Sequence, residues 1–426
     1  VAARNLRPAD SNGLSDPYVA LQLGKGALRR SRTVKKTLNP VFDTTFKFTV
    51  KKPATKKVAL KDFTLSITAK DKDVVGKDDL LGFRELAIGA LLGEGWRAES
   101  REAHQLCAIG SVMLVCSFVD AALLRPPCAG LLTVGLRRAS GLPAADDNGL
   151  SDPYCKLQLG SGKPMTSRKL AKTLDPIWGD DYRFELAVNR PLEDYRLEVC
   201  VKDKDMARDD TLGRLELDVG PVLGTDWSQP GEHALPLSDP RGEVPQSAIS
   251  GRLDDKYGRI HLGLSFIPEA LLRPPGDGLL VVSLLSAGGL IVADSSGSSD
   301  PFVKLALGAS DTAKSRVIEK NCDPVWGGDA FRFPVRADGF MPDWRLAVCV
   351  TDHDKVSAND VLGSLELDLG TVLNGKDWAN GGAPVPYRLG DREGKVDKSS
   401  MEGRDGLEHP FGVVTLGLEF IPARVL

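Results

Sequence analysis

A chain of 426 residues with 42% hydrophobic and 27% charged residues has room for two to four domains, each with its own core. Its formal net charge of −3 gives no reason to expect a nucleic-acid partner. The charge is unevenly spread, because residues 1–125 carry a balance of +8, whereas residues 126–273 and 274–426 carry −4 and −7. We therefore expect only the first third of the chain to favour anionic surfaces without a metal ion.

Two short acidic loops occur three times, with 136 and then 148 residues between the first Asp of successive copies. Intervals of this length indicate three whole domains in series rather than a solenoid. A repeated linker, Ala-Leu-Leu-Arg-Pro-Pro at residues 122–127 and 270–275, separates them with stiff proline pairs. We place the domains at residues 1–125, 128–270 and 276–426. The first is expected to lack its opening strand, because Val1 aligns with Arg137 of the second.

The predicted elements are short strands, because apolar residues alternate with polar ones. In chain order the pattern predicts strands at residues 18–23, 45–50, 65–69, 182–188, 197–201, 259–266, 331–335, 346–350 and 413–420. About eight strands in roughly 130 residues predict an all-β chain of three tandem eight-stranded antiparallel sandwiches. Two apolar runs, 108–124 and 278–293, fall short of the about 18–20 residues of a membrane span, so we expect buried strands and linker there.

The repeated loops have the composition of a calcium site, since each copy supplies five Asp. Residues two apart on a strand point to the same side, so each Asp-x-Asp pair would face the first loop across one end of a sandwich. Five carboxylates in one place are tolerable only beside a multivalent cation, and oxygen donors in this number suit Ca²⁺. The predicted ligands are Asp10, Asp16, Asp71, Asp73, Asp79, Asp146, Asp152, Asp203, Asp205, Asp210, Asp294, Asp300, Asp352, Asp354 and Asp360.

Segments around these loops resemble the signature segments of the C2 domain family. They lie at residues 12–19 (Asn-Gly-Leu-Ser-Asp-Pro-Tyr-Val), 36–42 and 78–82, with counterparts at 148–155, 172–178 and 209–213 and looser ones at 299–303, 321–326 and 359–363. The arrangement resembles the tandem modules of synaptotagmins, extended synaptotagmins (tricalbins) and multiple-C2-domain transmembrane proteins. The resemblance implies that the five Asp of each domain bind two or three Ca²⁺ ions at one tip, which docks on phospholipid.

Two of the loops depart from this pattern. The second domain has one residue fewer between Asp203 and Asp210 than the first has between Asp71 and Asp79, so we expect a different cradle geometry. The third domain replaces Asn-Gly-Leu by Ser-Ser-Gly-Ser at residues 295–298 and so loses an apolar tip residue. We expect the third domain to bind lipid least well.

Membrane binding would follow from a change of charge, because Ca²⁺ reverses the sign of a tip that an anionic bilayer otherwise repels. Exposed loop residues are expected to reach the lipid, namely Leu14, Val74, Val75, Lys77, Leu150, Met206, Arg208 and Val356. The resemblance also implies that the basic segment 29–36 holds phosphoinositide headgroups, and alternation would place Arg30, Arg32 and Lys36 on one face. The alternative is that these are ordinary solvated loop and surface residues.

Two other functions stay open, a calcium-independent protein-interaction scaffold and the regulatory region of a larger membrane-targeted protein. The chain has no Gly-x-Ser-x-Gly, Walker or His-Glu-x-x-His motif, so we do not expect an enzyme. Seven scattered Cys without a Cys-x-x-Cys pair favour free thiols in a reducing compartment. We therefore expect a cytoplasmic fragment of a longer protein, peripheral on membranes with phosphatidylserine or phosphoinositides and serving membrane trafficking or membrane contact. A membrane anchor would lie outside this chain.

Overall fold

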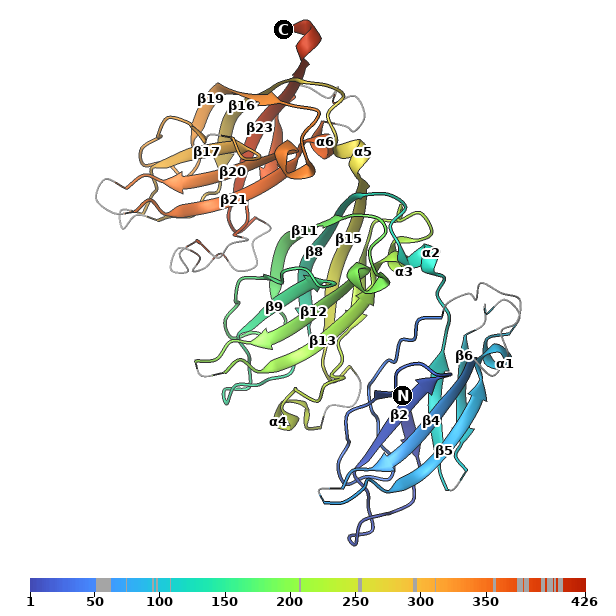
Figure 1. The fold of residues 1–426 in the computed structure, drawn as a ribbon. Helices are drawn as coiled ribbons and strands as arrows, with labels where there is room; N and C mark the ends of the chain where they lie inside the picture. Colours follow the sequence, from blue (N-terminus) through green and yellow to red (C-terminus); the bar gives the residue numbers. More distant parts are fainter. Residues whose placement is uncertain are drawn as a thin grey trace.

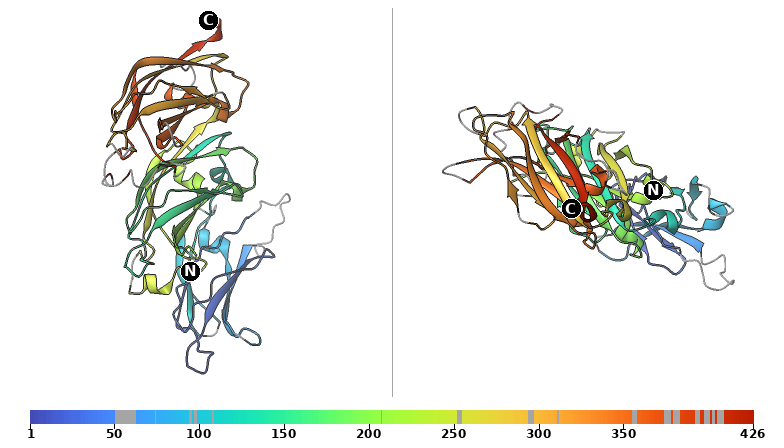
Figure 2. Two further views of the ribbon diagram at one scale, coloured as in Figure 1. Left: turned by 90° about the vertical axis from the view of Figure 1, so that its left-hand side faces the viewer. Right: turned by 90° about the horizontal axis from the view of Figure 1, so that it is seen from above.

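Three β-sandwiches follow one another along the chain in the computed structural model (Figure 1). The structure describes residues 1–50, 63–73, 75–93, 96, 99–107, 109–206, 208–251, 255–293, 297–310, 312–354, 358–373, 378, 383–391, 395–396, 401, 404 and 409–426. The views of Figure 2 show the sandwiches in a row, with the N-terminus in the first and the C-terminus at the far end of the third. The prediction of tandem all-β sandwiches is confirmed, and we call them units 1, 2 and 3.

Units 2 and 3 each contain two four-stranded antiparallel sheets in the part of the chain that the structure describes. The sheets of unit 2 have the strand orders β10-β9-β12-β13 and β11-β8-β15-β14, and those of unit 3 repeat these orders as β18-β17-β20-β21 and β19-β16-β23-β22. The bounds in unit 2 are β8 Gly130–Ser140, β9 Pro153–Leu159, β10 Met165–Thr166, β11 Ile177–Leu186, β12 Arg196–Asp203, β13 Thr211–Asp218, β14 Gly231–Pro236 and β15 Arg259–Pro268. Those in unit 3 are β16 Gly278–Gly288, β17 Pro301–Leu307, β18 Ala313–Lys314, β19 Val325–Val335, β20 Arg345–Asp352, β21 Val361–Asp368, β22 Val385–Arg388 and β23 Val413–Pro422.

Unit 1 has one sheet of the order β3-β2-β4-β5 and a smaller one of the order β1-β7-β6. The predicted strand at residues 45–50 does not form. Its counterpart β11 pairs with residues 130–138 of β8, and the chain contains no counterpart of residues 130–136 in unit 1. A strand without a neighbour leaves its backbone groups unpaired, so these residues stay irregular. The strands of unit 1 are β1 Ala2–Arg4, β2 Pro17–Leu23, β3 Arg29–Arg30, β4 Thr64–Asp71, β5 Leu80–Ala87, β6 Ser100–Gln105 and β7 Ser111–Cys116.

Each unit buries an apolar core between its sheets, and the central strands supply much of it. In β4, for example, Leu65, Ile67 and Ala69 are buried while the residues between them are partly exposed. Complete burial of a Leu or Ile side chain stabilises a fold by about 1.5–3 kcal/mol. The cores therefore fix β4, β12 and β20, whose last residues are the acidic Asp71, Asp203 and Asp352.

Each linker contains one helical turn, which lies just before its proline pair. The turn α2 (Ala121–Leu124) packs on α3 (Val219–Leu223) of unit 2, and α5 (Glu269–Leu272) packs on α6 (Leu369–Val372) of unit 3. Glycine permits this approach, because a Cβ on Gly220 would lie 1.8 Å from the carbonyl oxygen of Leu123. The other helical turns in the described residues are α1 Ile88–Leu92, α4 Gln246–Ile249, η3 Leu192–Tyr195, η4 Met341–Trp344 and η7 Ala423–Val425. Of the helices in the described residues, none is both long and apolar enough to cross a membrane.

Candidate metal centres at the tips

The first acidic loop of units 1 and 2 is a tight turn built by its own sequence. The side-chain oxygen of Asn12 accepts a hydrogen bond from the amide of Leu14 at 2.8 Å, and Asn148 and Leu150 repeat the bond at the same distance. Gly13 takes the left-handed conformation, with φ of 80°, that favours glycine. The turn therefore folds back over three residues and keeps its two Asp on one side.

A buried serine attaches this turn to the sandwich in every unit. The hydroxyl of Ser15 donates to the carbonyl of Arg7 and accepts from the amide of Ala9, both at 3.0 Å. Ser151 and Ser299 repeat the pair of bonds, and all three serines are fully buried. These serines were not predicted, although a Ser precedes the second Asp of the loop in all three copies.

The second acidic loop closes in the same way in all three units. The amide of Asp71 donates to the carbonyl of Asp79 at 2.8 Å, Asp203 donates to Asp210 at 2.8 Å, and Asp352 donates to Asp360 at 2.7 Å. The loop of unit 2 is one residue shorter, but its closing bond is as short as the others. The expected change of cradle geometry in unit 2 is therefore absent at the base of the loop.

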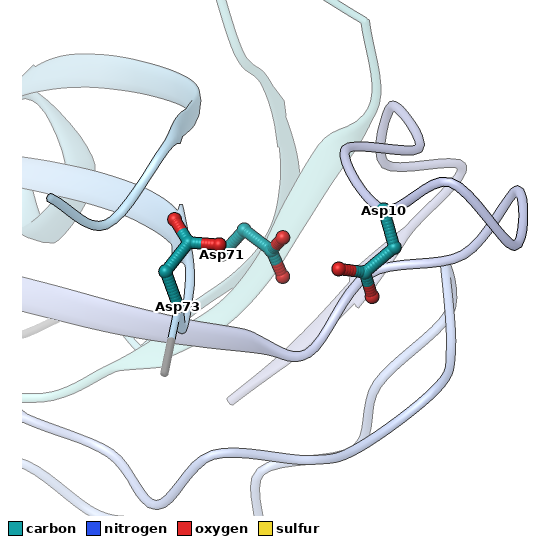
Figure 3. Close-up of side chains that lie close together, drawn as sticks. All are labelled: Asp10, Asp71 and Asp73. Carbon is teal, nitrogen blue, oxygen red and sulfur yellow. The ribbon is translucent and has the colours of Figure 1, made fainter. Parts of the chain in front are cut away.

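The two loops meet at one end of the sandwich. The amide of Asp16, in the first loop, donates to the Oδ1 atom of Asp71 at 2.5 Å, which ties the loops together. Carboxylate oxygens of Asp10, Asp71 and Asp73 then lie within 4.8 Å of one another. Figure 3 shows the carboxyl groups of Asp10 and Asp71 facing each other from the first loop and from the end of β4.

Unit 2 repeats this cluster with Asp146, Asp203 and Asp205, again within 4.8 Å of one another. In unit 3 the amide of Asp300 bonds Asp352 at 2.5 Å, as in the other units. Asp354 follows Asp352 at the same spacing, while the predicted ligand Asp294 lies outside the described residues.

The other predicted ligands lie beside the clusters. One carboxylate oxygen of Asp16, Asp152 and Asp300 accepts a backbone amide, from Lys36, Lys172 and Lys320 respectively, at 2.7 to 2.8 Å. Asp79 and Asp360 are exposed and Asp210 is half-buried.

The clusters are electrostatically unfavourable as they stand. Burial raises the pKa of Asp71, and the nearby charges of Asp10 and Asp73 raise it further. Burial likewise raises the pKa of Asp203, with Asp146 and Asp205 adding to the effect. Asp203 is 0% exposed. Each cluster therefore concentrates negative charge that a bound cation would neutralise.

At the tips, two buried carboxylate oxygens have no hydrogen-bond donor among the described residues. These are Oδ2 of Asp203 and Oδ2 of Asp354, at equivalent ends of units 2 and 3. A buried oxygen without a partner costs about 1–3 kcal/mol, which binding of a cation would recover. The donor set is entirely hard oxygen, so the residues present fit Ca²⁺ rather than a transition metal.

A second layer of residues orients the second loop. The hydroxyl of Tyr18 donates to Asp78 at 2.7 Å, and Lys72 Nζ lies 2.9 Å from the same carboxylate. These two partners lower the pKa of Asp78 to about 2. Tyr154, Asp209 and Lys204 repeat the arrangement in unit 2. This layer was not predicted, although an Asp-Asp pair occurs in the second loop of both units.

Within the described parts of the tips, unit 2 has an ion pair that units 1 and 3 do not repeat. Lys169 Nζ lies 2.5 Å from Oδ2 of the predicted ligand Asp152. The repeat has Thr33 and Val317 at this position in units 1 and 3. The Lys169 ammonium therefore already neutralises part of the negative charge that would attract a cation to the tip of unit 2.

Several predicted lipid-contacting residues of the second loop are exposed. Val75 is 89% exposed and Met206 is fully exposed. Lys77 and Arg208 are exposed beside them, whereas Leu14 and Leu150 are half-buried. Val74 and Val356 lie outside the described residues.

The basic segment of unit 1 does not present the single face that alternation suggested. The strand β3 ends at Arg30, so the alternation does not continue to Lys36, although both residues are exposed. Arg32 is half-buried and its Nε donates to the carbonyl of Phe42 at 3.2 Å. The structure therefore separates Arg32 from Arg30 and Lys36.

Known proteins share the three-domain pattern of this chain. The C2 domain family model matches residues 1–102, 130–237 and 278–380. The chain is 27% identical to multiple C2 and transmembrane domain-containing protein 1 of Mus musculus, over 88% of this chain and 43% of that protein. It is 32% identical to extended synaptotagmin-1 of Homo sapiens, over 62% of this chain and 23% of that protein.

The chain thus spans less than half the length of these relatives. The solved C2A and C2B domains of extended-synaptotagmin 2 with bound calcium cover 69% of this chain and 97% of their own, at 22% identity and a TM-score of 0.28. The family model matches most of the chain, with one match in each of the three sandwiches. The chain therefore belongs to the C2 domain family.

Proposed function

We propose that this protein binds anionic phospholipid membranes in a calcium-dependent manner through its three tips. The observation that carries the proposal is the buried Oδ2 of Asp203, which has no donor among the described residues and lies in a cluster of three carboxylates. Such a group is unfavourable in the folded chain unless a cation binds it. The same cluster recurs at the tip of unit 1.

Different residues of each tip would hold the cation and contact the membrane. The predicted Asp ligands of each unit would hold two or three Ca²⁺ ions, with Asp78 and Asp209 keeping the second loop in place. Bound Ca²⁺ would supply positive charge and open coordination positions to lipid phosphate or carboxylate oxygens. The exposed Val75 and Met206 would insert into the interfacial region beside these positions.

The charge of the units modulates this binding. Unit 1 carries the excess of basic residues, and the exposed Arg30 and Lys36 would add attraction to phosphatidylserine or phosphoinositide headgroups of at most about 1 kcal/mol each. Units 2 and 3 are acidic and would depend on the metal more strictly. The protein would act by binding rather than catalysis, as a peripheral membrane component in trafficking or membrane contact.

Co-sedimentation with vesicles tests the proposal. The full chain is mixed with phosphatidylserine-containing vesicles in Ca²⁺ or in EGTA, and compared with Asp203→Asn/Asp205→Asn and with the control Asp226→Asn, which changes an exposed Asp of unit 2 far from the tip. We expect binding in Ca²⁺ only, weakened by the tip variant and unchanged by the control. Equal binding in EGTA would reject the proposal and favour the protein scaffold or the basic face.

A further inference from the structure

Neighbouring units touch at the ends of the sandwiches where the linkers lie. Arg183 of β11, in unit 2, donates to Oδ2 of Asp368 and to the carbonyl of Glu366 at the end of β21 in unit 3, both at 2.7 Å. Arg345 of unit 3 bonds the other oxygen of Asp368 at 3.0 Å. The Arg183 and Asp368 side chains are largely buried, which favours a fixed geometry over a loose surface ion pair.

The same contact joins units 1 and 2 at the same positions of the repeat. Lys47 Nζ lies 2.7 Å from Oδ2 of Asp218, at the end of β13, and Arg196 bonds Oδ1 at 3.0 Å. Lys47 stands between two Phe as Arg183 stands between Tyr and Phe, so the two cations occupy matching positions. Despite the burial of Asp218, the two cations hold its pKa below the usual value.

A second contact joins neighbouring units near the tips. The guanidinium of Arg168, next to Lys169 at the tip of unit 2, lies 5.3 Å from the centre of the Phe411 ring in unit 3. Phe411 precedes β23, whose first residue pairs with Gly288 at the tip end of β16.

The matching positions in units 1 and 2 hold Arg32 and Tyr257. A Cβ on Gly242 of unit 2 would lie 3.5 Å from Cδ of Arg32, so the side chain reaches that unit. Burial raises the pKa of Tyr257 to about 12, and the positive charge of Arg32 opposes this rise. The near-tip contact is therefore also repeated.

The two contacts fix the relative direction of the units. Asp368 pairs with Arg345 at the start of β20, whereas the tip residue Asp352 ends that strand. At about 3.3 Å per residue, the linker end and the tip end of β20 are therefore about 23 Å apart. At each junction the first contact joins the linker ends of the two neighbouring units, and the second contact joins their tip ends. Neighbouring units therefore lie side by side with their tips toward the same side of the row.

The ribbon agrees with this arrangement. Figure 1 shows α1, α3 and α6, which mark the linker ends, on the right of their units, and the opposite strand ends on the left. The docking of α2 on α3 and of α5 on α6 adds a further connection at each junction. Because equivalent positions of the repeat form the contacts at both junctions, unit 2 lies against unit 1 as unit 3 lies against unit 2.

We infer that the three tips form one composite docking face for a single anionic bilayer leaflet, held in register by the repeated contacts between units. This inference rests on the proposed function. Three sites that reach one surface together bind more tightly than the separate sites by a factor of about 10² to 10⁴. An arrangement for bridging two membranes would instead point at least one tip away from the others.

Opening the junctions tests the inference in the full chain. In the variant Lys47→Asp/Arg183→Asp, both junctions bring two acidic groups together, and X-ray scattering should show a larger radius of gyration. We expect Ca²⁺ affinity without lipid to stay the same and affinity for phosphatidylserine vesicles in Ca²⁺ to fall at least about tenfold. The matched control is Arg332→Asp, at the equivalent but exposed position of unit 3, which should leave all three quantities unchanged.

Charge exchange supplies a second test, because adding Asp218→Lys and Asp368→Arg to the junction variant should restore compactness and vesicle affinity. An unchanged radius of gyration, or an opened chain that binds vesicles as tightly as before, would overturn the inference and leave calcium-dependent binding intact. Clustering of vesicles by the wild-type chain would overturn it in favour of bridging. Absence of any calcium-dependent binding would instead reject the proposed function and this inference with it.

Discussion

Replacement of Lys169 by Thr, the residue of unit 1 at this position, is predicted to raise the Ca²⁺ affinity of unit 2. The ammonium lies 2.5 Å from Asp152, and the two side chains are 31% and 20% exposed. An ion pair this open to water is worth about 0.2–1 kcal/mol. Because the flexible Lys169 side chain can move into solvent, the free-energy cost of displacing it on Ca²⁺ binding is no larger than the energy of this ion pair.

The dissociation constant of unit 2 should therefore fall by up to about fivefold, since about 1.4 kcal/mol corresponds to a factor of ten. Calorimetric Ca²⁺ titration measures this in a background of Asp71→Asn and Asp352→Asn, which weakens the other tips. Lys163→Thr is the control, because it removes the same charge from an exposed position of unit 2. An unchanged affinity in Lys169→Thr, or an equal gain in Lys163→Thr, would show that the ion pair of Lys169 does not oppose Ca²⁺ binding.

Three further predictions follow from burial and packing. In EGTA, Asp203→Asn should raise the Tm at pH 7. The pKa of Asp203 is raised in the folded chain, so the contribution of this carboxyl group to stability is present in acid and is lost as the pH rises through that pKa. Thermal melts from pH 4 to pH 7 should thus decline more steeply for wild type than for Asp203→Asn, and parallel curves would contradict this. Met206→Ser should weaken vesicle binding by about tenfold, the loss expected from about 1.5 kcal/mol of apolar burial, without changing lipid-free Ca²⁺ titration; altered Ca²⁺ binding would contradict the assignment. Gly370→Ala, whose Cβ would lie 2.3 Å from the Leu271 carbonyl oxygen, should lower stability by about 1–3 kcal/mol, whereas Gly89→Ala at the matching place in unit 1 should be tolerated, and equal melting of the two variants would argue against the docked linker.

Sequence patterns predicted the sandwiches well because burial on one face imposes a period of two. Residues 197–201 show this, since Leu197, Val199 and Val201 are buried within β12 as expected. The strand prediction failed at residues 45–50, where the local pattern is typical of a strand but the neighbour that would pair with it is missing. Pairing between distant segments is a tertiary condition that the local pattern does not contain.

The convergence of acidic loops was predictable because the same spacing recurs three times. The contacts of Arg32 and Arg168 were not, since a basic residue in a charged segment has the same local pattern whether it faces lipid, solvent or the next unit. The junction residues Arg183 and Asp368 lie 185 residues apart, and each alone resembles an ordinary surface residue. Only the fold brings them together.

Calorimetric titration of the full chain with Ca²⁺ in the absence of lipid shows whether the acidic tips are Ca²⁺ sites. We expect saturable binding of two or three ions per unit, reduced when Asp203→Asn/Asp205→Asn disables the tip of unit 2. Asp226→Asn should titrate like wild type. An absence of binding heat, or a titration that the tip variant leaves unchanged, would show that the acidic tips are not Ca²⁺ sites.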